Sequence, residues 1–123
     1  MMSEPEHHLT TVAVVDADRA ALAEKVAALR ALDGVEVRIA AGSLGELLTD
    51  PAFPPDVAII EQREGERVTI NYKIRVCRLA NARVIVVADK AAERSGELAP
   101  DVASLMTPVR TFEKALRLLA APR

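Results

Sequence analysis

Residues 55–62 are the stretch that most constrains the fold. They read Pro-Asp-Val-Ala-Ile-Ile-Glu-Gln, a short apolar run that ends on the carboxylate of Glu61. A run of this length and composition is typical of a strand that is buried on both faces of a parallel sheet. Open α/β sheets place their sites at the carboxyl ends of such strands, so we expect any chemistry of this domain near Glu61.

Length and composition indicate one globular domain that does not read nucleic acid by itself. A chain of 123 residues with 50% hydrophobic residues can bury one core. Because it has only two Phe, one Tyr and no Trp, base stacking is disfavoured, and a net charge of −2 gives no attraction to a polyanion. We expect residues 1–9 to be a flexible tail, residues 10–121 to form the domain, and residues 122–123 to start a linker or end the chain.

The sequence predicts neither a disulfide nor a metal site. Cys77 is the only cysteine and falls on one helix face with Ile70 and Ile74, so we expect it in the core rather than in redox sensing. His7 and His8 have no Cys or acidic partners at metal-ligand spacing. Because no stretch is typical of a signal peptide or a membrane span, the cytoplasm is the expected compartment and no membrane partner is expected.

Strand and helix patterns alternate along the whole chain. Strands are predicted at residues 11–15, 35–39, 55–62, 83–88 and 102–106. Helices are predicted at residues 20–32, 44–48, 69–80, 91–98 and 112–119. In the third helix we expect Lys73, Arg75 and Arg78 to face solvent. This alternation predicts an α/β fold, a doubly wound five-stranded parallel sheet of order 2-1-3-4-5 with helices on both faces.

The predicted topology brings acidic residues to one edge of the sheet. Asp16 and Asp18 follow the first strand and Glu61 ends the third, so we expect them to lie together above the point where the strand order reverses. Asp18 is well placed to cap the helix that follows, whereas Asp16 has no such local role. The mixed-charge segment 62–68 is expected to be a solvated loop.

Four motifs together resemble one known family. They are Val-Val-Asp-Ala-Asp after the first strand, Pro-Asp-Val-Ala-Ile-Ile-Glu for the third, Arg-Val-Ile-Val-Val-Ala for the fourth, and Leu-Met-Thr-Pro-Val near the fifth. In order and spacing, residues 10–121 resemble the receiver domain of bacterial response regulators. In that family an aspartate at the end of the third strand accepts a phosphoryl group, and a pair of acids after the first strand helps to bind Mg²⁺.

Carried over residue by residue, the resemblance leaves most of the family's phosphorylation site degenerate. Asp16 matches the first acid, but Ala17 stands where the second acid binds metal. Glu61 replaces the acceptor aspartate, Ala88 replaces the hydroxyl residue that ends the fourth strand, and Thr107 replaces the lysine before the proline.

The family's switch residues are also missing. Ser104 stands at the position of the switch aromatic, and the segment 90–101 has room for only a shortened fourth helix. With Ala17 and Thr107 in place of a carboxylate and an ammonium, the charge balance for phosphoryl transfer is expected to fail, and no cofactor or bound metal is expected. The resemblance therefore implies an atypical or pseudo-receiver. Glu61 could imitate a phosphorylated state, but Ala88 has no hydroxyl group that it could draw toward itself.

The function expected from this resemblance is a phosphorylation-independent signalling module, not an enzyme. It would form a homodimer or dock a protein partner or output domain, as the N-terminal part of a transcriptional response regulator. Arg110, Lys114 and Arg117 give the last helix a basic face that fits either a partner or plain solvation. One alternative is a small-molecule sensor that uses the vacated acidic pocket, and another is an anti-sigma-factor-antagonist-like module with Ser43 or Ser95 as the phosphorylated residue.

Overall fold

The computed structural model describes residues 9–63, 69–88 and 105–120. Its elements in chain order are β1 (Thr10–Val15), α1 (Arg19–Arg30), β2 (Val35–Ala41), α2 (Leu44–Thr49), β3 (Val57–Glu61), α3 (Ile70–Leu79), β4 (Arg83–Val87), β5 (Thr107–Val109) and α6 (Phe112–Ala120). The helix predicted at residues 91–98 lies outside the described residues. Ser95, the second candidate for a phosphorylated serine, and most of the N-terminal segment lie outside them too. Within the described part of the chain, no helix combines the length and the apolar character that a membrane crossing requires.

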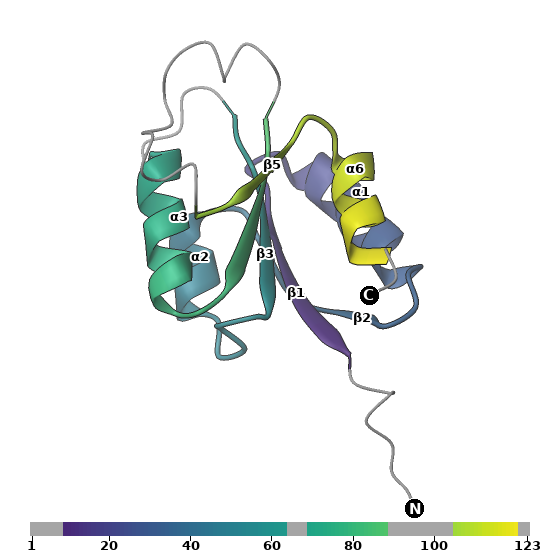
Figure 1. The fold of residues 1–123 in the computed structure, drawn as a ribbon, viewed down its shortest axis with the longest axis horizontal. Coiled ribbons are helices and arrows are strands. Elements are labelled where there is room, and N and C mark those ends of the chain that lie inside the picture. Colours follow the sequence, from purple (N-terminus) through teal and green to yellow (C-terminus); the bar gives the residue numbers. More distant parts are fainter. Residues whose placement is uncertain (1–8, 64–68, 89–104, 121–123) are drawn as a thin grey trace, which may run out of the picture.

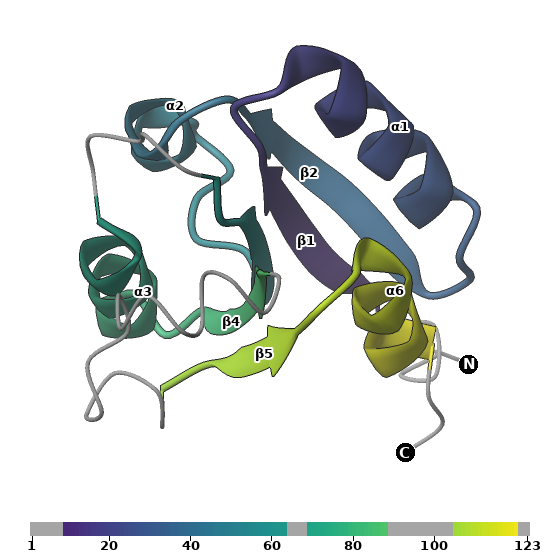
Figure 2. The same cartoon turned by 90° about the horizontal axis from the view of Figure 1, so that it is seen from above.

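The predicted sheet is confirmed. Five parallel strands are arranged in the order β2-β1-β3-β4-β5. Helices α1 and α6 cover one face of the sheet, and α2 and α3 cover the other (Figures 1 and 2). Strand β2 lies at one edge, as its alternating pattern predicted, and β5 lies at the opposite edge.

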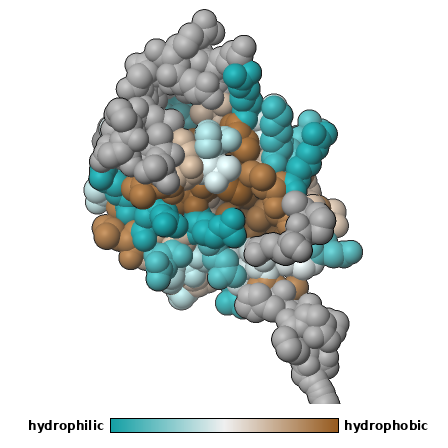
Figure 3. All heavy atoms as spheres, viewed as in Figure 1, coloured by the Kyte–Doolittle hydropathy of each residue, from teal (hydrophilic) through white to brown (hydrophobic). Residues whose placement is uncertain are grey.

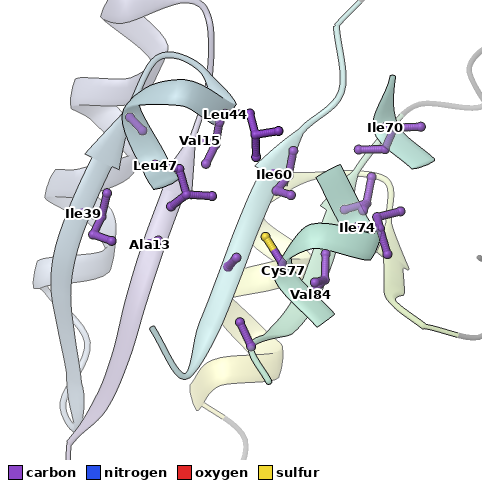
Figure 4. Close-up of a cluster of buried hydrophobic side chains, with 14 of the residues drawn as sticks. Ala13, Val15, Ile39, Leu44, Leu47, Ile60, Ile70, Ile74, Cys77 and Val84 are labelled. Atoms are coloured by element: carbon purple, nitrogen blue, oxygen red, sulfur yellow. The ribbon is translucent and has the colours of Figure 1, made fainter. Parts of the chain in front are cut away.

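Two apolar layers hold the helices on the sheet. On the α1/α6 face, Leu22, Leu29 and Ala115 pack against one side of the central strands. On the α2/α3 face, Leu47, Ile74 and other side chains pack against the other side (Figure 4). The core position of Cys77 is confirmed: it is fully buried, and burial raises the pKa of its thiol to about 11. The protonated thiol is a poor nucleophile, which disfavours a redox role.

Strand β5 corrects one prediction. The prediction put the fifth strand at 102–106, where apolar residues are denser, but the strand is Thr107–Val109. Leu105 and Met106 precede it and pack against the α2/α3 layer, and residues 102–104 lie outside the described part. Pro108 is compatible with this strand because an edge strand has one side with no ladder hydrogen bond to donate. The proline therefore lies within the strand, opposite Val86, and does not end it.

Lys73 corrects a second prediction. The helical pattern placed it on the solvent face of α3 beside Arg75 and Arg78, and both arginines are indeed exposed. Lys73, however, is only 2% exposed. It follows the buried Ile70 by three residues and directly precedes Ile74, so its stem lies on the buried side of the helix, where the long alkyl chain can be covered by neighbours.

Candidate functional site at the carboxyl edge of the sheet

The strand register brings three chain segments to one edge. Val15 of β1 lies beside Ile60 of β3, and Glu61 lies beside Val87 of β4. Asp16 therefore emerges next to Glu61, and Ala88 emerges one strand further along. The prediction that Asp16 and Glu61 meet at this edge is confirmed, because each directly follows one member of the paired residues Val15 and Ile60.

Asp16 is the buried centre of the site. Its side chain has no exposed surface and accepts four hydrogen bonds. One comes from the Asp18 backbone N–H at 2.9 Å, one from Lys25 and two from Arg63. Burial by itself raises the pKa of the Asp16 carboxyl, but the hydrogen bonds from Arg63 and Lys25 outweigh this effect and lower the pKa to about 2. Asp16 is thus ionised at neutral pH despite its burial.

Lys25 joins the two carboxylates of the site. It extends from α1, and its Nζ lies 2.6 Å from Asp16 Oδ2 and 2.6 Å from Glu61 Oε1. Its side chain is only 10% exposed. The ammonium also lies 5.5 Å from the centre of the Phe112 ring on α6, within the range of a cation–π interaction. A single cation therefore links β1, β3 and the last helix.

Arg63, which follows β3, is the second cation that pairs with Asp16. Its Nε lies 2.5 Å from Asp16 Oδ1 and its Nη2 lies 2.9 Å from Asp16 Oδ2, which is a bidentate pair. Hydrogen bonding to Asp16 raises the pKa of the guanidinium, which stays charged. The prediction that this charged segment is only a solvated loop is therefore wrong for Arg63, and residues 64–68 of the same segment lie outside the described part.

Only some of the remaining predicted site residues lie at this edge of the sheet. Asp18 is exposed and caps α1 by accepting a hydrogen bond from the Ala21 N–H at 3.0 Å, as predicted. Ala17 is exposed beside it, and Ala88 is 7% exposed at the end of β4. Thr107 does not reach this edge, because it pairs with Ile85 in the middle of β4. Ser104 lies outside the described residues.

The network changes the expected charge balance. Because Thr107 replaces the lysine of the family, the sequence implied an acidic pocket without a positive charge. Lys25 and Arg63 instead supply two cations for the two carboxylates of Asp16 and Glu61, so the four groups sum to zero. Neither cation was singled out from the sequence. A signal existed for Lys25, which falls between Leu22 and Leu29 on the buried face of α1, where an unpaired lysine would be costly.

These residues do not fit the Mg²⁺ ion that receiver domains use. Mg²⁺ needs several oxygen ligands in octahedral geometry, and among the described residues the carboxylates that Lys25 brings together are Asp16 and Glu61. Both oxygens of Asp16 are already hydrogen-bonded to cationic groups, and the Lys25 ammonium lies between the two carboxylates. A divalent cation would have to displace Lys25 and Arg63 and then lie beside their positive charges.

The sheet order and the acidic residues at its switch point define a fold of the receiver type. No family model matches the sequence, and no curated protein matches it. Among solved structures, the fold is similar to the signal receiver domain of the response regulator NarL from Mycobacterium tuberculosis, with a TM-score of 0.62 and 18% sequence identity. The match covers 94% of this chain and 99% of that one, so the receiver fold spans almost the whole sequence.

Proposed function

We propose that this chain is a receiver-type signalling module that works without phosphorylation of a carboxylate. The observation that carries the proposal is the position of Lys25, whose ammonium bridges Asp16 and Glu61. The similarity to a receiver domain in fold supports the signalling class. The ion pairs that Asp16 and Glu61 form with Lys25 and Arg63 support the proposal that this is an atypical or pseudo-receiver.

Two physical arguments disfavour phosphoryl transfer to Glu61. The carboxylate would have to attack a phosphorus centre while cations neutralise the charge that develops on the transferred group, and Mg²⁺ does not fit here. In addition, Glu61 Oε1 is hydrogen-bonded to Lys25, so that oxygen is a weaker nucleophile. Glu61 and Lys25 instead form a permanent internal pair. We infer that this pair holds the edge in one state, where a phosphorylated receiver would alternate between two.

The output of such a fixed module would be binding to another protein. We propose a homodimer, a partner or an output domain in a longer regulator of transcription, with no direct binding of nucleic acid by this segment. Three exposed cations on and before α6 form the best candidate contact surface: Arg110, Lys114 and Arg117. The cytoplasm is the compartment that fits this role. A catalytic function is not proposed, because each charged group of the site is committed to a neighbour.

The alternative of a sensor that binds its ligand in the acidic pocket receives no support from the geometry. That alternative needed a pocket with free carboxylates, whereas both Asp16 and Glu61 already have cationic partners. A ligand would have to break these ion pairs before it could bind. The anti-sigma-antagonist alternative keeps Ser43 as its candidate residue, because Ser43 is exposed at the start of α2, where its Oγ accepts from the Glu46 N–H.

The proposal is tested by incubation with acetyl phosphate and Mg²⁺, followed by intact-mass measurement and by light scattering after size-exclusion chromatography. We expect no added phosphoryl mass and the same oligomer size with and without the phosphodonor. A phosphorylatable receiver domain treated in parallel serves as the positive control. A stoichiometric, hydroxylamine-labile adduct on Glu61 would overturn the proposal. A protein that is monomeric with and without the phosphodonor would refute only the homodimer part of the proposal.

A further inference from the structure

A cavity of about 130 Å³ lies at the opposite edge of the sheet from the acidic residues. It is enclosed by Val57, Val84 and Ile85 of the central strands and by Leu118 and Leu119 of α6. Val57 is the first residue of β3 and pairs with the first residue of β4, which places the cavity at the amino ends of these strands. It shares no lining residue with the Asp16 site.

The cavity exists because few side chains of the α1/α6 layer cover the amino ends of β3 and β4. Strand β5 has only three residues and starts level with Ile85, so it covers little of β4. Leu118 is 47% exposed, and it completes one wall instead of filling the space. On the face seen in Figure 3, hydrophobic atoms reach the surface in the region of β5 and α6. The wall therefore combines apolar side chains with a comparable area of polar atoms, and it is open at one side.

One cation lines this cavity. Arg83, the first residue of β4, is exposed and contributes to the wall, together with the hydroxyl-bearing Thr10 and Thr107. Among the described residues, Arg83 forms no ion pair. The neighbouring Asp56 forms no ion pair with the Arg83 guanidinium: its carboxylate accepts a hydrogen bond from the Thr11 N–H at 2.9 Å, and its carbonyl accepts from the Arg83 backbone N–H.

We propose that this cavity binds a small monocarboxylic acid with a compact apolar body. Its volume approaches that of the roughly 150 Å³ cavity in which an engineered protein binds benzene, so a ring or a branched chain of similar size fits. The guanidinium of Arg83 is suited to a carboxylate at the mouth, since its planar donors match two carboxylate oxygens. The apolar side chains of the wall supply affinity, and Arg83 supplies the preference for an anion.

Such a ligand would act on the last helix. It would contact both β4 and the end of α6, and so it would stabilise the packing of α6 on the sheet. The site needs none of the groups that pair at the acidic edge. This inference therefore does not depend on the function proposed above, and either can fail without the other.

Benzoate is the probe, and benzamide is its neutral counterpart of the same shape. We expect millimolar benzoate to shift the methyl resonances of Ile85, Leu118 and Leu119 in a saturable way. Benzamide should bind about tenfold more weakly, because its neutral carbonyl accepts a weaker hydrogen bond from Arg83 than a carboxylate does. This comparison uses the unchanged protein, so no variant needs to fold. Equal binding of the two compounds, or no saturable shift at these methyl groups, would overturn the proposal.

Two matched variants locate the anion preference. Arg83→Gln should lower benzoate affinity to that of benzamide, whereas Lys114→Gln, which removes an exposed cation of α6 outside the cavity, should leave it unchanged. Circular dichroism checks that both variants are folded. If the two variants lose benzoate binding equally, the anion binds to the basic surface alone and the proposed site is wrong.

Discussion

At the carboxyl edge of the sheet four charged side chains neutralise one another, whereas at the amino edge one arginine lines a cavity of about 130 Å³. The first arrangement resists movement, since moving any member breaks at least one ion pair to the buried Asp16 or to Lys25. The second is adaptable, because its walls lose only dispersion contacts when they move. The same sheet therefore carries one locked edge and one that a ligand can fill.

The largest effect is expected from Asp16→Ala, which breaks the locked edge. The substitution removes the acceptor of Lys25, Arg63 and the Asp18 N–H, and it leaves Lys25 with Glu61 alone. Breaking a buried pair in this way costs about 3–5 kcal/mol, and urea unfolding measures it. The control is Glu36→Ala, which removes the exposed pair with Arg38 and should cost no more than about 1 kcal/mol. Equal losses would mean that the edge is not locked.

Lys25→Met should have the next largest effect. Methionine keeps most of the stem's packing against Phe112 but removes the cation that bridges the carboxylates, for an expected loss of about 2–3 kcal/mol. The exposed Lys114→Met is the matched control and should be nearly neutral. If Glu61→Gln in the Lys25→Met background costs as much as it does in the unchanged protein, the two residues are not coupled and the internal pair is refuted.

The pH dependence of unfolding follows from Asp16. Its pKa is about 2 in the folded protein and 3.8 when unperturbed, so the unfolded chain takes up the proton first as the pH falls. The contribution to stability is complete above about pH 4 and is lost between about pH 4 and pH 2, and it amounts to about 2 kcal/mol. Urea midpoints across this range should fall in the unchanged protein and fall less steeply in Asp16→Asn. Identical slopes would show that another group titrates.

The smallest effect is expected at the adaptable edge. Val57→Ile adds a methylene that can project into the cavity and should stabilise the protein by about 0.5–1 kcal/mol. The same change at Val14, in the packed α1/α6 layer, should instead destabilise by about 1–3 kcal/mol because no space receives the added group. Calorimetric Tm values distinguish the two. A destabilised Val57→Ile protein would mean that the cavity cannot accept even one methylene.

Much of the fold was predictable because the signals that specify it are local. The apolar run before Glu61, the alternation of Val35 and Val37, and the Asp18 cap each depend on a few neighbouring residues. Strand β5 was the exception. Its three residues contain a proline and carry little apolar pattern, so its pairing with β4 comes from the sheet and not from its own sequence.

The site was predictable only in part. The sequence by itself determined that the carboxylates of Asp16 and Glu61 end two adjacent buried strands, because strand length and hydrophobic pattern are properties of the chain. Only the tertiary structure decided what surrounds them. Lys25 lies 9 residues from Asp16 in the chain and Arg63 lies 47, and long flexible side chains leave no periodic signal of where their charged ends lie. Burial of Asp16 left a charge that had to be neutralised, and the fold brought these two cations within reach of it.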